Sequence, residues 1–194
     1  MYTLNTRQQA AESRRQIRDA LLALMETVPF EEITITQICR QANVARQTYY
    51  RNFELKSDIF AFHLDTLFQQ FFESCYRGGD MEAELLGFFD FMLKQRRLLL
   101  LSAQNGLFHW FSQSIVQNIP QFLSVSEVIH LADPGEERYV TGFIASTVSS
   151  LLSLWAERGL AESPAWMAGI ANRFLRGLQP ADPTLPVNRP TEAR

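Results

Sequence analysis

Cysteine is scarce in this chain of 194 residues, which contains only Cys39 and Cys75. Two cysteines cannot build a disulfide framework or, by themselves, a metal site, and they suit a reducing compartment. The histidines, His63, His109 and His130, lack the i, i+3 or i, i+4 spacing of a metal-binding pair. We therefore expect no metal ion and no other cofactor.

Long apolar runs are also missing. A membrane-spanning helix needs roughly 18 uncharged apolar residues, and even the apolar region 85–101 contains Asp90, Lys94, Arg96 and Arg97. Residues 1–16 are polar and basic without an apolar segment, so we expect no secretion signal, no membrane partner and a cytoplasmic protein. With 46% hydrophobic and 20% charged residues, the composition is that of a globular protein.

Common enzyme signatures are absent as well. The sequence has no G-x-S-x-G, no H-E-x-x-H, no P-loop and no cluster of a nucleophile with a base. We therefore expect a binding protein rather than an enzyme.

The net charge of −3 conceals a local asymmetry. Residues 36–53 contain Arg40, Arg46 and Arg51 and no acidic residue. A small positive patch on an acidic body suits a localised contact with phosphates, because electrostatic attraction decays within about 8–10 Å at physiological salt. A solvated helix face would explain the same charges.

Helical periodicity dominates the sequence and predicts an all-α fold of about nine helices. The first helix carries an apolar stripe from Ile17 to Val28 and ends at Pro29. The segment 31–36 alternates like a short strand, but Thr34 and Gln37 form a capping box, which favours a helix over 34–42. The remaining helices are expected at about 45–52, 55–76, 81–97, 98–102, 107–118, 124–131, 136–158 and 164–177.

The second and third predicted helices form a helix-turn-helix. Asn43 tolerates the left-handed conformation of a tight turn. After it, Arg46, Gln47 and Thr48 stand at the start of a helix that could enter a major groove and contact bases. Phosphate contacts are expected at the edges, from Thr36, Tyr50 and Lys56. Tyr49 and Cys39 are predicted to be buried.

The stretch PFEEITITQICRQANVARQTYYRNFELKSDIF resembles the N-terminal domain of the TetR family of bacterial transcriptional regulators, with Tyr50, Phe53 and Lys56 at the positions of the family's Tyr-x-x-Phe and Lys. The resemblance covers residues 11–71. It implies phosphate contacts by Thr36, Tyr50 and Lys56, and base or phosphate contacts by Arg46, Gln47 and Thr48. Asn43 replaces the usual glycine of the turn, and Ala45 replaces a frequent serine.

The expected organisation is a helix-turn-helix domain at 11–71, with the motif at 34–53, a regulatory and dimerisation domain at 72–177 and a disordered tail at 178–194. The resemblance implies a homodimeric regulator of operator DNA, a repressor relieved by a small-molecule effector of unknown identity. A ligand-dependent activator and an all-α dimerisation or adaptor module without DNA binding are the alternatives.

Two residue sets carry the expected functions of the second domain. A dimer interface is predicted on the last two helices, although an intramolecular core would give the same stripes. Its residues are Phe143, Thr147, Leu151, Leu154, Trp155, Ile170 and Phe174. Aromatic residues either line an effector cavity or fill the core. These are Phe88, Phe91, Met92, Phe108, Trp110 and Phe111.

Overall fold

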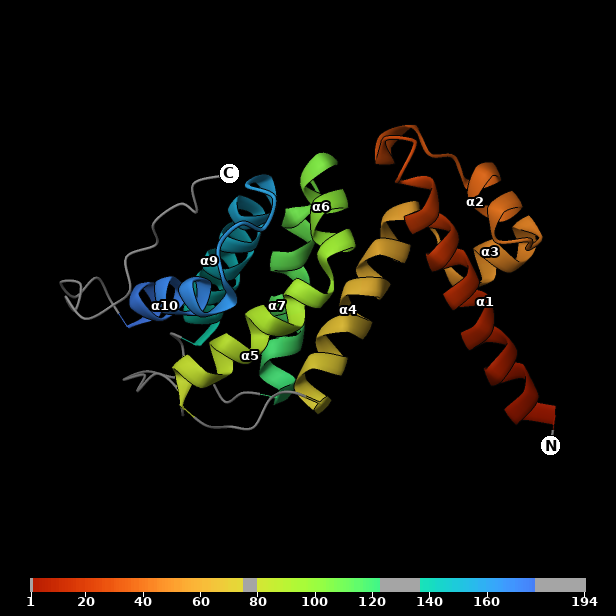
Figure 1. Cartoon of the computed structure of the whole chain (residues 1–194). Coiled ribbons are helices and arrows are strands. Elements are labelled where there is room, and N and C mark those ends of the chain that lie inside the picture. The colour runs from red at the N-terminus through yellow and green to blue at the C-terminus, as the bar shows by residue number, and fades with distance from the viewer. Residues whose placement is uncertain (1, 75–79, 123–136, 177–194) are drawn as a thin grey trace.

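The computed structural model describes residues 2–74, 80–122 and 137–176, and within these ranges it consists of nine α-helices and one 3₁₀ helix (Figure 1). The all-α prediction is confirmed. The helices are α1 (Tyr2–Leu24), η1 (Phe30–Glu32), α2 (Ile35–Gln41), α3 (Arg46–Asn52), α4 (Lys56–Ser74), α5 (Met81–Lys94), α6 (Arg96–Gln104), α7 (Phe108–Phe122), α9 (Glu137–Glu157) and α10 (Pro164–Leu175).

Local sequence signals explain several helix boundaries. Thr34 caps α2 in a complete capping box with Gln37, as predicted. Asn43 adopts φ 53° in the turn before α3, the conformation that its side chain tolerates better than most. Ser163 caps α10, with Pro164 in its first turn. Gly159 ends α9 at φ 71°.

Other boundaries differ from the sequence-based expectation. The alternating segment after Pro29 forms the 3₁₀ helix η1 before α2 begins. The expected helix 81–97 is divided at Gln95 into α5 and α6. The helix expected to end before Pro120 continues to Phe122, because a proline in a last turn removes only one backbone hydrogen bond. The expected helix 124–131 and the tail 178–194 lie outside the described residues.

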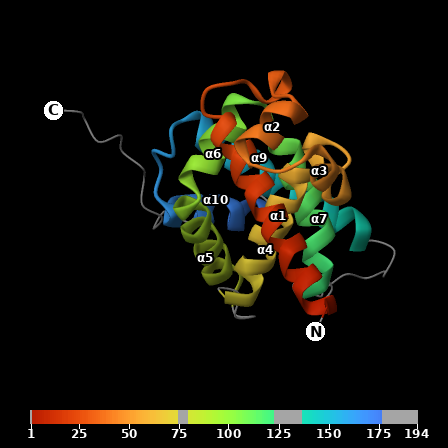
Figure 2. The ribbon, with the colours of Figure 1, turned by 90° about the vertical axis from the view of Figure 1, so that its right-hand side faces the viewer.

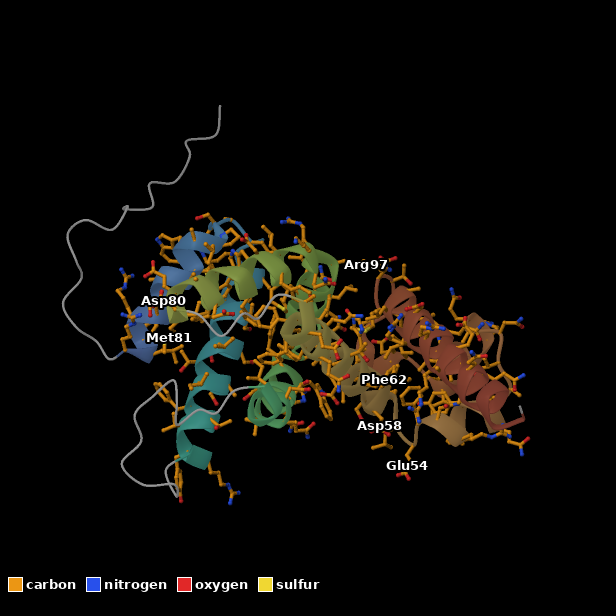
Figure 3. The ribbon with its side chains drawn as sticks, turned by 90° about the horizontal axis from the view of Figure 1, so that it is seen from below. Glu54, Asp58, Phe62, Asp80, Met81 and Arg97 are labelled. Atoms are coloured by element: carbon orange, nitrogen blue, oxygen red, sulfur yellow. The ribbon has the colours of Figure 1, made fainter. Side chains whose placement is uncertain are left out.

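Helices α1, α2 and α3 pack together at one end of the molecule, and the helices from α5 to α10 form a larger body (Figures 1 and 2). Helix α4 packs on α1 and also, extensively, on α7, so it belongs to both parts. Asp58 starts α4 by accepting the backbone N–H groups of Glu54 and Leu55 at 3.0 and 2.7 Å; Figure 3 labels Glu54 and Asp58 at this corner.

A buried polar group ties α4 to α7. Asp65 of α4 accepts hydrogen bonds from Ser114 Oγ at 2.5 Å and Asn118 Nδ2 at 3.2 Å. Because a buried polar atom is costly unless it is paired, this group favours one alignment of the two helices.

One helix among the described residues, Arg138–Glu157, is long and apolar enough to cross a membrane by length and composition. It packs against α6, α7 and α10. Its fully buried residues include Ala145 and Leu152. The helix therefore serves as a central helix of the body.

Candidate DNA-binding surface

The helix-turn-helix is built by local hydrogen bonds at the turn. The N–H of Val44 donates to the carbonyl of Cys39 at 3.0 Å, and the N–H of Ala42 donates to that of Ile38 at 2.8 Å. Asn43, between them, takes the positive φ that lets the chain reverse within a few residues. The turn thus sets the crossing of α2 and α3 from backbone geometry alone.

One face of α3 is anchored in the interior. Tyr49 has 0% exposure, and its ring meets those of Tyr50 and Phe53 at centroid distances of 5.3 and 6.3 Å. Burial raises the pKa of Tyr49 to about 12. Cys39 is buried beside this core, and burial raises the pKa of its thiol. Both residues lie where the sequence predicted, and Cys39 packs as a small apolar side chain.

The opposite face of α3 is open to solvent. Arg46 and Gln47 are exposed at its N-terminus, and Tyr50 follows with 58% exposure. Thr48 is half-buried. The guanidinium of Arg46 donates a hydrogen bond to the hydroxyl of Thr36 on α2. The structure therefore brings together Arg46 and Thr36, and leaves Gln47 and Tyr50 projecting beside them.

Lys56 is in a different situation. Its ammonium donates to the carbonyls of Phe30 and Glu31 at 2.6 and 2.7 Å and to that of Ile33 at 3.3 Å. It also lies 4.8 Å from the centroid of the Phe30 ring. An ammonium has three protons, and all three are directed at these carbonyls. The geometry therefore favours a structural role at η1 over the phosphate contact that the resemblance implies.

Arg14 is a residue of this surface that the sequence reasoning missed. Its Nε donates to Oδ1 of Asn52 at 3.3 Å, and its guanidinium lies 5.9 Å from the centroid of Phe62, which Figure 3 labels. Asn52 in turn donates to the carbonyl of Thr48 at 2.8 Å. Arg14 thereby connects the exposed part of α1 to the end of α3. No spacing rule links positions so far apart in the sequence.

The aromatic residues considered for an effector cavity mostly pack against each other. Phe111 meets Phe68 and Phe108 at centroid distances of 6.5 and 4.8 Å. Phe88 stacks on Phe68 at 6.3 Å, and Met92 is fully buried. Phe91 meets the ring of Phe71 at 5.5 Å. These contacts join α4, α5 and α7 into one apolar core.

Trp110 lies apart from that core. It lines an open cavity of about 510 Å³ between the start of α7 and the η1 turn. The other walls come from η1, the start of α2 and the start of α4. They include Phe30, Ile33, Ile35, Leu55, Lys56 and Leu107.

The residues considered for a dimer interface divide into two groups. Phe143, Leu154 and Phe174 are 58%, 57% and 43% exposed, which is unusual for large apolar side chains. The side chains of Thr147, Leu151 and Ile170 are half-buried. These six residues belong to the two C-terminal helices of the described chain, α9 and α10.

Trp155 corrects the prediction. It is 1% exposed, its ring meets that of Phe89 at 5.7 Å, and its Nε1 donates to the carbonyl of Glu162 at 3.0 Å. The turn after α9 supplies this acceptor, because Gly159 and Leu160 both adopt positive φ. Trp155 is therefore a core residue of the protomer and is not available to a partner.

The fold and this surface define an all-α protein with a helix-turn-helix beside a helical body. No protein-family model matches the sequence, and the search of curated proteins finds no match either. Solved structures do match. One is FadR of Thermus thermophilus, a TetR-family transcriptional repressor solved in complex with lauroyl-CoA. Its TM-score is 0.57 at 18% identity, with 90% of this chain and all of that chain covered.

A second similar structure is the dihydroxyacetone kinase operon activator DhaS. Its TM-score is 0.55 at 15% identity, over 84% of this chain and 94% of that chain. Both alignments cover the helix-turn-helix part together with most of the body. The chain therefore has the TetR-type fold throughout, and the resemblance of residues 11–71 extends structurally to the divergent second half.

Proposed function

We propose that the protein is a sequence-specific DNA-binding transcriptional regulator that acts as a homodimer. The observation that carries the proposal is the exposed face of α3, where Arg46, Gln47 and Tyr50 stand in solvent while Tyr49 anchors the helix from behind. A helix in this setting fits a major groove, where arginine pairs with guanine and glutamine with adenine.

The division of contacts follows from the geometry. Gln47 projects without a bonded neighbour among the printed contacts of α3, so we assign it to base edges, with Thr48 beside it. Thr36 and Tyr50 flank the helix and are assigned to phosphates. Arg46, beside Thr36, reaches a base or the adjoining phosphate. The expected phosphate contact of Lys56 is not part of this proposal, since its ammonium is bonded to carbonyls.

Dimerisation is proposed through α9 and α10. Phe143, Leu154 and Phe174 form an apolar surface that water does not favour, and a twofold axis would cover it with its own copy. A dimer would also present two recognition helices to half-sites about 34–36 Å apart. Thr147, Leu151 and Ile170 complete this interface, and Trp155 supports it from inside.

A small-molecule effector is proposed to bind the body and change operator affinity by favouring one of two conformations. FadR, one of the similar structures, was solved with lauroyl-CoA. For this chain we propose no chemical identity beyond an apolar ligand near the aromatic core. We propose a repressor; the similarity to DhaS, an activator, keeps ligand-dependent activation as the second candidate. A cytoplasmic location follows from either role.

The experiment is selection of bound fragments from the source genome at near-physiological salt, followed by sequencing. Recovery of one palindromic site supports a dimeric, sequence-specific regulator and points to the genes it controls. Enrichment of no sequence with or without cell extract as a source of effector would contradict the proposal and leave an adaptor module as the explanation.

A further inference from the structure

The helix-turn-helix part and the body meet at a second joint besides α4. The N–H of Phe30, at the start of η1, donates to Oδ1 of Asn105 at 2.7 Å, across 75 residues of sequence. Arg97 Nε also lies 2.5 Å from Glu26 Oε1, and Figure 3 labels Arg97 where the body approaches α1. The turn between α6 and α7 therefore contacts the connection between α1 and α2.

Phe30 is held from several directions at this joint. Its carbonyl accepts from Lys56 at 2.6 Å, and its ring meets that of Phe60 at 6.4 Å. The side chain of Phe30 is buried. Asn105 and Lys56 thus bind the two ends of the same peptide residue, one from the body and one from α4.

Asn105 is itself well positioned. Its Nδ2 donates to the carbonyl of Leu101 at 2.8 Å, and its backbone N–H donates to the same carbonyl at 3.1 Å. The side-chain amide is therefore anchored to the end of α6 and directs its oxygen at Phe30. An amide is suited to this task because it carries a donor and an acceptor on one rigid plane.

Apolar packing across the joint is incomplete. The cavity of about 510 Å³ separates Trp110 and Leu107 of the body from Ile33 and Ile35 of the other part. Where side chains do not close a gap, the directional contacts at its edge gain importance in setting the relative orientation. The Asn105–Phe30 hydrogen bond is such a contact. The Glu26–Arg97 pair is solvent-exposed and contributes less.

We propose that Asn105 is a positioning residue for DNA binding, which orients the helix-turn-helix on the body through the N–H of Phe30. This inference rests on the proposed function, since its consequence is the spacing of two recognition helices in a dimer. Without the hydrogen bond, each helix-turn-helix samples more orientations. Binding to a full palindrome then costs more ordering, whereas binding to a single half-site does not.

The test compares three variants of the full-length protein. Asn105→Ala removes the acceptor; Asn105→Asp keeps an oxygen for the Phe30 N–H and loses the donation to Leu101. Gln104→Ala alters the exposed neighbouring residue and serves as the matched control. The measurements are the hydrogen-exchange rate of the Phe30 amide and the affinities for a full palindrome and for DNA with one half-site, each across a salt series.

Asn105→Ala is expected to speed exchange of the Phe30 amide and to weaken full-palindrome binding roughly two- to tenfold, the range for one hydrogen bond. Half-site affinity and the salt slope should stay unchanged, because the phosphate contacts are intact. Asn105→Asp and Gln104→Ala should behave like the natural protein. Equal losses on half-site and full palindrome, or no loss, would overturn the proposal. If the natural protein selects no site, the proposed function fails instead, and the amide exchange still reports on the joint.

Discussion

Arg46 and Thr36 belong to different helices of the helix-turn-helix, and the guanidinium of Arg46 donates a hydrogen bond to the hydroxyl of Thr36. The bond joins the start of α3 to the exposed side of α2. It limits the rotamers of a long side chain on an otherwise open surface, so Arg46 is oriented before DNA arrives.

This relationship predicts non-additive effects on DNA binding. Thr36→Val removes the acceptor, Arg46→Ala removes the donor, and the double variant removes both. Residues in contact couple by about 0.5–3 kcal/mol in such cycles, so the double variant should lose less affinity than the two single losses combined. Titration of a fluorescent operator fragment measures the three affinities. Strict additivity would show that the two residues act independently.

Lys56 is predicted to support folding rather than to bind phosphate. Lys56→Met keeps the aliphatic chain and removes three hydrogen bonds to the η1 turn. Thermal denaturation should show a loss of about 1–3 kcal/mol of stability, since carbonyls in a half-buried turn lose their partner. The slope of log affinity against log salt should not change.

The alternative for Lys56 is equally measurable. A lysine that neutralises one phosphate contributes about one counterion to that slope. A slope smaller by about 0.9 in Lys56→Met, with unchanged thermal stability, would show that the ammonium leaves the carbonyls and binds DNA. Arg40→Met, at an exposed position on α2, offers a comparison with the same loss of charge.

The apolar surface of α9 and α10 is predicted to hold the dimer together. Leu154→Glu places a charge on a side chain that is 57% exposed in the protomer, so folding of the protomer should tolerate it. In a dimer the same charge would be buried without a partner, which costs several kcal/mol. Sedimentation should show the variant as a monomer. Leu86→Glu on α5, also among the exposed apolar residues, is the control and should leave the oligomeric state unchanged.

His63 is predicted to make stability depend on pH. Burial, with a further contribution from Arg18, lowers the pKa of His63 to about 4 from its ordinary value near 6.5, while Asp19 acts in the opposite direction. The unfolded chain therefore binds a proton between pH 6.5 and 4 that the folded chain does not, so stability falls as the pH drops through this range.

The expected loss attributable to His63 is about 3 kcal/mol, complete by about pH 4. His63→Gln has no titrating group and should reduce the pH dependence of denaturant unfolding in that window. His109→Gln, at an exposed position, should leave it as it is. An unchanged profile in His63→Gln would contradict the buried, neutral state of the imidazole.

Much of the fold was predictable because its signals are local. The capping box of Thr34, the turn at Asn43 and the Ser163–Pro164 start of α10 each depend on a few neighbouring residues. The same holds for the exposed face of α3, where Arg46 and Gln47 follow directly after the turn.

The remaining features depend on contacts between distant parts of the chain. Trp155 lies on a helix with apolar residues on two sides, and periodicity alone does not say which side faces inward. Its burial follows from the acceptor on Glu162. The engagement of Lys56 with η1 and of Asn105 with Phe30 likewise depends on how α4 and α6 approach the turn. No spacing in the sequence encodes those approaches.

The central claim is that α3 reads DNA sequence, and fragment selection with a recognition-helix variant tests it most directly. The natural protein, the double variant Arg46→Ala with Gln47→Ala, and the control Gln113→Ala on exposed α7 are each incubated with the same genomic fragments. We predict one palindrome for the natural protein and the control, and no preferred sequence for the double variant. Recovery of the same palindrome by the double variant would contradict the account.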